Sequence, residues 1–314
     1  MTKTQTTTTN KTPTRWHYNN TDNHKLQNPN GVPCPAKQLC RWDIIITLTT
    51  TNYKTPMSNI TNPLTELMAT PRRNLLNIYC TAGYPNLSDT TNIISALTVA
   101  GADMIEIGIP FSDPLADGPT IQKSNVQALQ NGMTVKILLD QLSQFEIKVP
   151  IILMGYFNPI LQFGVEEFCA QCADVGIAGL IIPDLPLEYY LSRYQEIFEK
   201  HNLCNICLVT PETSESRIRY IDKYSTGFIY AVSSSSTTGG KSSVVDADDY
   251  LRRLSTMNLQ NPLMTGFNIH DRASFNRASK YTRGAIIGSA FIRAIADSEN
   301  MSETISSFVK NIRP

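Results

Sequence analysis

The sequence predicts an α/β fold, a (β/α)8 barrel preceded by a disordered or non-native N-terminal extension. From Leu75 onward, short apolar runs alternate with amphipathic stretches of helical length, and eight such repeats fill roughly 240 residues. With 314 residues, of which 41% are hydrophobic and 17% charged, the composition is that of an ordinary globular protein.

The eight strand-like runs are continuous and rich in β-branched residues, as expected for parallel strands buried on both faces. They are Leu75–Thr81, Met104–Gly108, Ile151–Gly155, Gly179–Ile182, Ile206–Thr210, Gly227–Val232, Pro262–Thr265 and Ala285–Gly288. A doubly wound open sheet is the alternative, but it more often has a Gly-x-Gly-x-x-Gly turn after its first strand. Residues 81–86 read TAGYPN instead, which favours a TIM barrel.

Four of the intervening stretches carry helix-boundary signals. Ser88–Ala100 opens with Ser-Asp and closes at Gly101, and Leu187–His201 follows a Pro-Leu turn. Ser214–Tyr224 has a glutamate in its first turn, and Asp246–Met257 begins with an acidic cap. Because active sites of these barrels lie at the carboxyl ends of the strands, we look for reactive side chains there.

Residues 1–56 differ from the rest of the chain. They contain seven Lys or Arg and two Asp, a net charge of +5, which leaves 20 basic and 25 acidic residues elsewhere. The segment is rich in Thr and Asn, and its apolar residues show no periodicity, so it cannot bury enough surface to offset its ordering entropy. We expect a disordered extension over 1–56 and a catalytic barrel over 57–314; a targeting peptide is the alternative.

The charge of the whole chain excludes some partners. Its 27 basic and 27 acidic residues balance, which gives no electrostatic signature for nucleic acid or an anionic membrane. No apolar run approaches the roughly 18–20 residues needed to span a bilayer. An odd number of cysteines, seven, without a signal peptide indicates a reducing compartment, which we expect to be the cytoplasm.

Two Cys-x-x-Cys pairs, Cys169/Cys172 and Cys204/Cys207, raise the possibility of a zinc site. The first pair lies in a predicted helix and the second in a predicted strand, where positions i and i+3 point to opposite faces. Neither pair has the turn glycine of a zinc knuckle. We therefore expect buried free thiols and no metal.

Three acidic residues lie in or just after the second predicted strand: Glu106 within it, and Asp113 and Asp117 in the segment that follows. Glu106 lies between two isoleucines, and a carboxylate directed into a barrel is costly to bury unless it is protonated, paired or used. It is either a structural glutamate held by a neighbouring donor or a general acid/base. Residues 111–119 (FSDPLADGP) predict a restricted loop that places Asp113 and Asp117 over the same mouth. Two carboxylates in different environments favour a division of labour, one moving protons and one staying ionised.

A second group of residues follows the last two predicted strands. Gly266–Asn268 ends the seventh strand, and Gly288–Phe291 ends the eighth and starts a short helix. Barrels frequently bind phosphate with these loops and a helix N-terminus. The backbone N–H groups of Gly288 and Ser289 are the expected donors; a plain turn is the alternative.

The segment Ser233–Ser243 reads SSSSTTGGKSS after the sixth predicted strand. Its Gly-Gly-Lys-Ser resembles part of a P-loop, but the first glycine of that motif is missing. We expect a mobile lid that closes over the ligand, the alternative being a flexible loop without function.

Three tyrosines, Tyr79, Tyr156 and Tyr230, lie on or beside predicted strands. They are either core aromatics or the walls of a flat pocket with polar tips. We expect His270, just past the seventh strand, to begin a helix rather than to act as a base.

The long loop motif resembles the signature of the tryptophan synthase α subunit family. It spans residues 105–122 (IEIGIPFSDPLADGPTIQ), and further motifs in the family's order are 80–85 (CTAGYP), 183–186 (PDLP), 233–239 and 284–290 (GAIIGSA). The resemblance covers about residues 60–312, and the extension has no counterpart.

This resemblance implies a lyase of tryptophan biosynthesis that cleaves indole-3-glycerol phosphate to indole and glyceraldehyde 3-phosphate by a retro-aldol reaction. It implies Glu106 as general acid/base and Asp117 as the second catalytic carboxylate. The matching pocket positions are Tyr79, Tyr156, Tyr230 and Thr238, and the phosphate positions are Gly239, Phe267, Asn268, Gly288 and Ser289. Two residues depart from the family pattern. Asn268 occupies a position where many members have glycine, and Ser236 replaces a glycine that some members have in the lid.

The resemblance also implies a partner. The family's α subunit docks a β subunit that carries pyridoxal phosphate, as an α2β2 heterotetramer, and Asp113 and Asp184 would lie towards it. No metal or organic cofactor is expected in this chain. The alternatives are a catalytically silent barrel that only binds and activates its β subunit, and another sugar-phosphate barrel enzyme.

Overall fold

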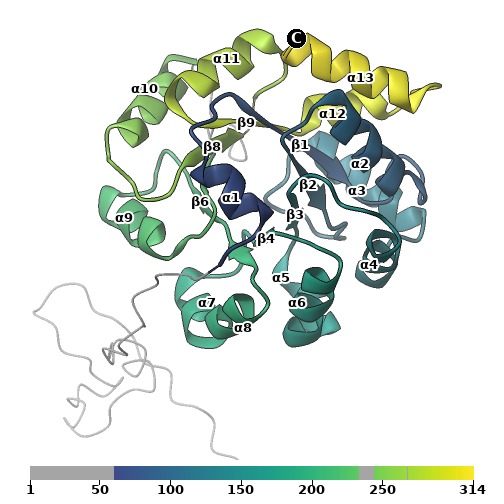
Figure 1. The fold of residues 1–314 in the computed structure, drawn as a ribbon, viewed down its shortest axis with the longest axis horizontal. Helices are drawn as coiled ribbons and strands as arrows, with labels where there is room; N and C mark the ends of the chain where they lie inside the picture. The colour runs from purple at the N-terminus through teal and green to yellow at the C-terminus, as the bar shows by residue number, and fades with distance from the viewer. Residues whose placement is uncertain (1–59, 233–243, 267) are drawn as a thin grey trace, which may run out of the picture. The chain divides into compact units, whose positions relative to one another are not determined.

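The computed structural model describes residues 60–232, 244–266 and 268–314, so the predicted extension 1–56 lies outside the described residues. The described residues form one parallel sheet in the order β5-β4-β3-β2-β1-β9-β8-β7-β6, with helices around its outside (Figure 1). The strands are β1 (Leu75–Thr81), β2 (Met104–Gly108), β3 (Ile151–Met154), β4 (Gly179–Ile181), β5 (Cys204–Asn205), β6 (Cys207–Val209), β7 (Ile229–Val232), β8 (Leu263–Gly266) and β9 (Gly284–Ile287).

The two ends of this sheet meet within one short segment of chain. β5 pairs with β4 and β6 pairs with β7, and only Ile206 separates β5 from β6. The Ile206 N–H still donates to the carbonyl of Leu180 at 3.0 Å. β5 and β6 therefore together form one strand of the barrel, so the nine segments make eight strands around the barrel axis. The predicted (β/α)8 barrel is confirmed, with its fifth strand beginning earlier than predicted and interrupted once.

Helices cover the outer face of the barrel and its N-terminal end (Figure 1). They are α1 (Pro63–Ala69), α2 (Asp89–Ala100), α3 (Pro119–Gln130), α4 (Val135–Ser143), α5 (Phe157–Phe163), α6 (Val165–Asp174), α7 (Leu187–Arg193), α8 (Gln195–Lys200), α9 (Glu215–Tyr224), α10 (Val244–Ser255), α11 (Arg272–Tyr281), α12 (Ser289–Ile295) and α13 (Met301–Ile312). Among the predicted boundaries, Ser214 caps α9 by accepting from Arg217 N, and Gly101 ends α2 with φ +96°, a left-handed conformation suited to glycine.

Three details of the predicted helices were wrong. The single helix predicted over Leu187–His201 is divided into α7 and α8 at Tyr194, whose φ of −125° departs from helical geometry. The ring of Tyr194 packs 5.4 Å from that of Phe157 on another helix, a contact that sequence periodicity does not reveal. The helix predicted from Asp246 begins at Val244. Ser88 precedes α2 but makes no side-chain capping hydrogen bond.

The N-terminal end of the barrel is covered by α1, which lies across it in Figure 1. Leu64 and Met68 of α1 belong to the same buried cluster as Leu75, Met104 and Phe228 near the starts of the strands. The segment before α1 is held as well, because Asn62 Nδ2 donates to the Ala178 carbonyl at 2.8 Å. This end of the barrel is thus filled by apolar side chains.

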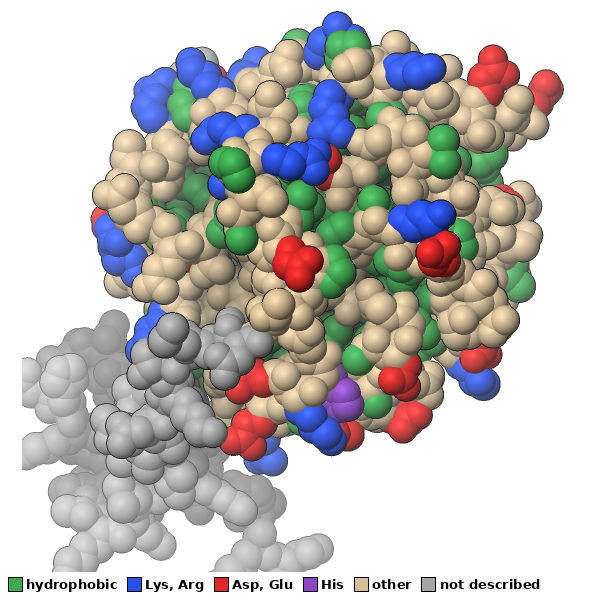
Figure 2. Space-filling view, in the orientation of Figure 1, with side chains coloured by type: hydrophobic (Ala, Val, Ile, Leu, Met, Phe, Trp, Pro, Cys, Tyr) green, Lys and Arg blue, Asp and Glu red, His purple; other side chains and the backbone are tan. Residues whose placement is uncertain are grey.

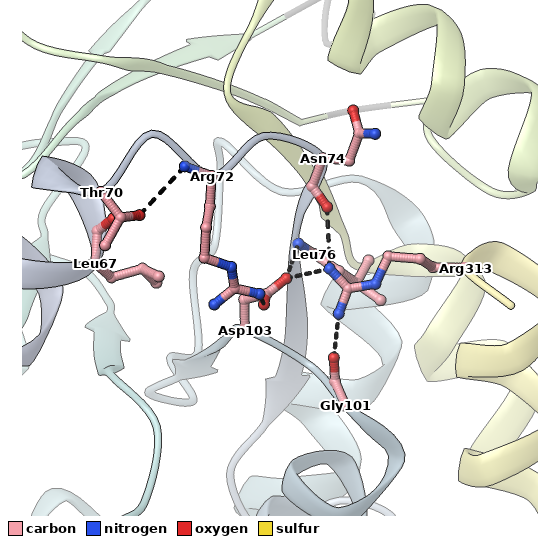
Figure 3. Close-up of polar contacts among 8 residues, drawn as sticks. All are labelled: Leu67, Thr70, Arg72, Asn74, Leu76, Gly101, Asp103 and Arg313. Carbon is pink, nitrogen blue, oxygen red and sulfur yellow. Dashed lines mark hydrogen bonds and ion pairs between the residues drawn. The ribbon is translucent and has the colours of Figure 1, made fainter.

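A buried ion cluster ties the C-terminal end of the chain to the starts of β1 and β2 (Figure 3). Only 4% of the Asp103 side chain is exposed, and its carboxylate pairs with Arg72 and Arg313. Asp103 Oδ2 also accepts from Leu76 N at 2.8 Å. Arg313 donates in addition to the carbonyl of Asn74 at 3.0 Å. A buried carboxylate is retained here because its charge is paired and its oxygens accept hydrogen bonds.

The surface on the α1 side of the barrel is polar and charged (Figure 2). Lys and Arg side chains gather in its upper part, near α10, α11 and α13. The last turns of α10 and α11 contain Arg252, Arg253 and Lys280, where cations interact favourably with the helix dipole. Among the described helices, none has the length and apolar character needed to cross a membrane.

Candidate active site

The barrel contains a cavity of about 620 Å³ at the carboxyl ends of its strands. Seven of the residues predicted to form the site line this cavity, together with apolar residues of β3 and β9. The seven are Tyr79, Glu106, Asp117, Tyr230, Asn268, Gly288 and Ser289. The volume is in the range of a small-molecule site.

Glu106 lies in the middle of β2 and is 1% exposed. Its register neighbour on β1 is Tyr79, and its Oε2 accepts a hydrogen bond from Asn77 Nδ2 at 3.2 Å. Burial raises the pKa of Glu106 to about 8, helped by the nearby charge of Asp117, while the Asn77 hydrogen bond acts in the opposite direction. At neutral pH this carboxyl group is therefore mostly protonated.

Asp117 lies in the loop between β2 and α3, which ends at Gly118 and Pro119, the first residue of α3. Its Oδ2 accepts from Tyr156 Oη at 3.3 Å and from Asn125 Nδ2 at 3.5 Å. Burial raises the pKa of Asp117 to about 6, and both hydrogen bonds limit the rise. The two carboxyl groups thus have different protonation states near pH 7, the arrangement expected for a proton donor beside an anion.

Two of the predicted tyrosines extend across neighbouring strands where those strands have glycine. A Cβ placed on Gly108 would lie 2.0 Å from Tyr79 Oη, and one on Gly266 would lie 2.1 Å from Tyr230 Oη. Both rings are about 5% exposed and line the cavity. The glycines therefore provide the space in which the two phenols lie. Tyr156 instead binds the Asp117 loop, because its Oη also accepts from Ala116 N at 2.9 Å.

Residues at the ends of β8 and β9 also line the cavity. Gly288 and Ser289, which were predicted to bind phosphate, line it at the junction of β9 and α12. Asn268 has φ +56°, the left-handed region that glycine and asparagine tolerate best, so asparagine is compatible with a glycine position here. The predicted residues Thr238, Gly239 and Phe267, and the lid Ser233–Ser243 with Ser236, lie outside the described residues.

Sequence reasoning missed several residues that line the cavity or contact Glu106. Arg293 of α12 lines the cavity, and its Nη1 donates to Thr120 Oγ1 at 3.3 Å. His270 lines it too, directly before Asp271, which caps α11, so the predicted role at a helix start is confirmed but incomplete. Asn77, the hydrogen-bond donor to Glu106, was also missed. A polar residue within the apolar run 75–81 was the signal that could have found it.

Asp113 and Asp184 are both exposed in loops at the same end of the barrel. Asp184 Oδ1 accepts from Phe157 N at 2.8 Å, at the start of α5. Leu115, in the same loop as Asp113, is 85% exposed. These residues form a mixed apolar and acidic surface beside the cavity mouth.

The cysteines in the described residues are unpaired. They are Cys80, Cys169, Cys172, Cys204 and Cys207, and burial raises the pKa of each thiol. In this part of the chain no three His, Cys, Asp or Glu side chains are grouped so that they could hold a metal ion.

A sequence model of the family described as tryptophan synthase alpha chain matches residues 64–313. The chain belongs to this family. The tryptophan synthase alpha chain of Flavobacterium johnsoniae is 54% identical over 260 residues, covering 82% of this chain and 100% of the relative. That of Parabacteroides distasonis is 48% identical over 255 residues, covering 80% and 99%.

Solved structures agree with this family membership. Tryptophan synthase subunit alpha from Legionella pneumophila has a TM-score of 0.73 at 30% identity, with 82% of this chain and 98% of that chain covered. An aminoacrylate-bound tryptophan synthase from M. tuberculosis gives 0.70 at 29% identity, covering 80% and 96%. Tryptophan synthase alpha chains are lyases that cleave indole-3-glycerol phosphate in tryptophan biosynthesis.

Proposed function

We propose that this chain cleaves indole-3-glycerol phosphate to indole and glyceraldehyde 3-phosphate, with Glu106 and Asp117 as its catalytic residues. The observation that carries the proposal is the pairing in one cavity of a carboxyl group with a pKa of about 8 and another with a pKa of about 6. The proposal is also supported by Gly288 and Ser289, the predicted phosphate donors, which line the same cavity.

Glu106 carries the proton through the reaction. As a neutral acid it protonates C3 of the indole ring, which gives an indolenine cation. The resulting carboxylate then accepts the proton of the adjacent glycerol hydroxyl while the carbonyl forms. The electron pair of the broken C–C bond returns to the ring and releases indole. Glu106 regains a proton in the second transfer, so the enzyme ends in its starting state.

Asp117 supplies fixed negative charge. As an anion it accepts a hydrogen bond from the indole N–H and stabilises the positive charge that develops on the ring. Tyr79, Tyr156 and Tyr230 form or support the walls of the indole pocket, with Thr238 as a further pocket residue. Backbone N–H groups at Gly239, Phe267, Asn268, Gly288 and Ser289 hold the phosphate.

We further propose that the chain works in the cytoplasm as the α subunit of an α2β2 heterotetramer. The exposed residues Asp113, Leu115 and Asp184 support a docking surface beside the cavity mouth, on which a β subunit would receive the released indole. Pyridoxal phosphate belongs to that partner, and this chain needs no metal or organic cofactor in the scheme above. No nucleic acid or membrane partner is proposed.

An indole-release assay with indole-3-glycerol phosphate tests the proposal. We expect weak activity alone and marked stimulation by a β subunit. Glu106→Gln should lower turnover about 10³-fold or more while phosphate-ligand binding is retained. Undiminished turnover of that variant rejects the assigned role. If the chain releases no indole but still activates the β subunit, it is a catalytically silent barrel. If it turns over ketose phosphates instead, it is a sugar-phosphate enzyme.

A further inference from the structure

Asn77 is a buried polar residue on the inner face of β1. It lies two residues before Tyr79, and residues two apart on a strand share a face. Its exposed fraction is 0%, and its Nδ2 donates to Glu106 Oε2 at 3.2 Å. Within the described residues, its Oδ1 is buried without a hydrogen-bond partner. An unpartnered buried amide oxygen costs free energy that a leucine of similar shape would avoid.

The two ends of this amide match the two protonation states of a carboxyl group. The Nδ2 end is a donor and suits the ionised carboxylate, which only accepts hydrogen bonds. The Oδ1 end is an acceptor and suits the neutral acid, which has an O–H to donate. A rotation of the amide by about 180° exchanges the two ends. The partner of Glu106 can therefore follow a change in its protonation.

We propose that Asn77 is a positioning residue that holds the Glu106 carboxyl group through both of its proton transfers. The inference rests on the proposed function, in which Glu106 gives a proton to the indole ring and takes one from the glycerol hydroxyl. Asn77 itself gains and loses no proton. It keeps the carboxyl group oriented while the charge on that group appears and disappears.

The other groups that face Glu106 fit this role. Tyr79 from β1, Tyr230 from β7 and Asp117 from the loop after β2 are the titratable groups around it, and the Cys80 thiol lies on the other face of β1. Burial raises the pKa of both phenols and of the thiol, so these three groups are neutral near pH 7. β3 and β9 contribute only the apolar Met154 and Ile286 to the cavity lining.

The test compares the full-length chain with Asn77→Leu, Asn77→Asp and Asn77→Ser. A matched control is Asn205→Leu, because Asn205 is 6% exposed and its Nδ2 contacts Cys207 Sγ at 3.5 Å rather than a catalytic carboxyl. Indole release gives kcat, KM and their pH dependence. Carbon-13 NMR titration of the glutamate carboxyls, with Glu106 assigned by its absence in Glu106→Gln, gives a readout that does not need activity.

We expect Asn77→Leu to lower kcat about 10- to 100-fold, because the variant loses one hydrogen bond to a charged group. KM should change less than about threefold. The basic limb of the pH profile and the NMR midpoint of Glu106 should both move to higher pH. Asn77→Asp should also lower kcat and move the Glu106 midpoint to higher pH. It provides the test if the leucine variant does not fold. Asn77→Ser, which keeps a donor and an acceptor, should lie between Asn77→Leu and the unmodified chain.

The inference is overturned if Asn77→Leu or Asn77→Asp keeps the kcat and Glu106 midpoint of the unmodified chain. It is also overturned if Asn205→Leu shows the same loss, because the effect would then be general destabilisation. If the unmodified chain releases no indole, the proposed function itself is rejected, and this result is distinct from a failure of the Asn77 inference.

Discussion

Tyr156 Oη binds two consecutive residues of the loop after β2, donating to Asp117 Oδ2 at 3.3 Å and accepting from Ala116 N at 2.9 Å. Its donation favours the ionised form of Asp117. Tyr156→Phe should therefore raise the pKa of Asp117 above its present value of about 6. The acidic limb of the activity profile should move to higher pH by about 0.5–1 unit.

Tyr189→Phe is the matched control for that experiment. Tyr189 lies in α7, is 44% exposed, and its ring contacts Phe157 and Tyr194 rather than Asp117. An unchanged acidic limb in Tyr156→Phe would contradict the role given to this hydroxyl.

The pH dependence of indole release should be bell-shaped. The reaction needs ionised Asp117, so the rate should fall below pH about 6. It also needs neutral Glu106 for the first transfer, so the rate should fall again above pH about 8. The two limbs belong to a pair of interacting carboxyls, and their midpoints describe the pair. A profile that keeps rising to pH 10 would show that Glu106 does not act first as an acid.

The burial of Glu106 also makes a prediction about stability. Its pKa rises from 4.5 in the unfolded chain to about 8 in the folded protein, so between these values the folded state binds the extra proton. The free energy of unfolding should fall with pH in this window, by up to about 1.4 kcal/mol per pH unit, relative to Glu106→Gln. Urea unfolding of both proteins at pH 5, 6, 7 and 8 measures the difference. Parallel curves would show that Glu106 is not desolvated.

The Asp103 cluster should matter to the fold and not to the chemistry. Asp103→Ala leaves the Arg72 and Arg313 guanidinium groups without their carboxylate, and we expect a loss of about 2–4 kcal/mol in unfolding free energy. Asp140→Ala, in an exposed ion pair with Lys136, should cost less than about 1 kcal/mol. Urea denaturation compares the two, and equal losses would argue against the importance of burial.

Much of the fold could be predicted because buried parallel strands leave a plain pattern. The runs 75–81 and 104–108 were predicted to the residue, since both are apolar and bounded by turns. The division at Tyr194 and the interruption at Ile206 could not be predicted. At Tyr194 the ring contacts Phe157, which is distant in sequence. At Ile206 the strand changes its neighbour from β4 to β7, which depends on the closure of the barrel and not on local sequence.

The site was predictable to the extent that its residues occur in motifs. Glu106 and Asp117 lie in one long motif, and the structure brings both to the same cavity. Arg293 and Asn77 were missed because one lies inside an amphipathic helix and the other inside an apolar strand, where neither belongs to a recognisable motif. Only the barrel geometry directs them towards the site.

The boundary of the catalytic domain remains a proposal. Removal of residues 1–56 should leave the unfolding free energy and the rate of indole release unchanged, because the capping residue Asn62 and the helix it caps are retained. Thermal unfolding and the indole assay on chains starting at Met1 and Met57 check this. A large loss of stability in the shorter chain would show that the extension packs on the barrel.

Gly108 and Gly266 have a consequence for how this enzyme can diverge. Each leaves room for one tyrosine ring, and neither gives or takes a proton. An added methyl group at either position would collide with the phenol, so the tyrosine would have to move and the shape of the cavity would change. Preference among ring systems can thus evolve separately from the bond-breaking step.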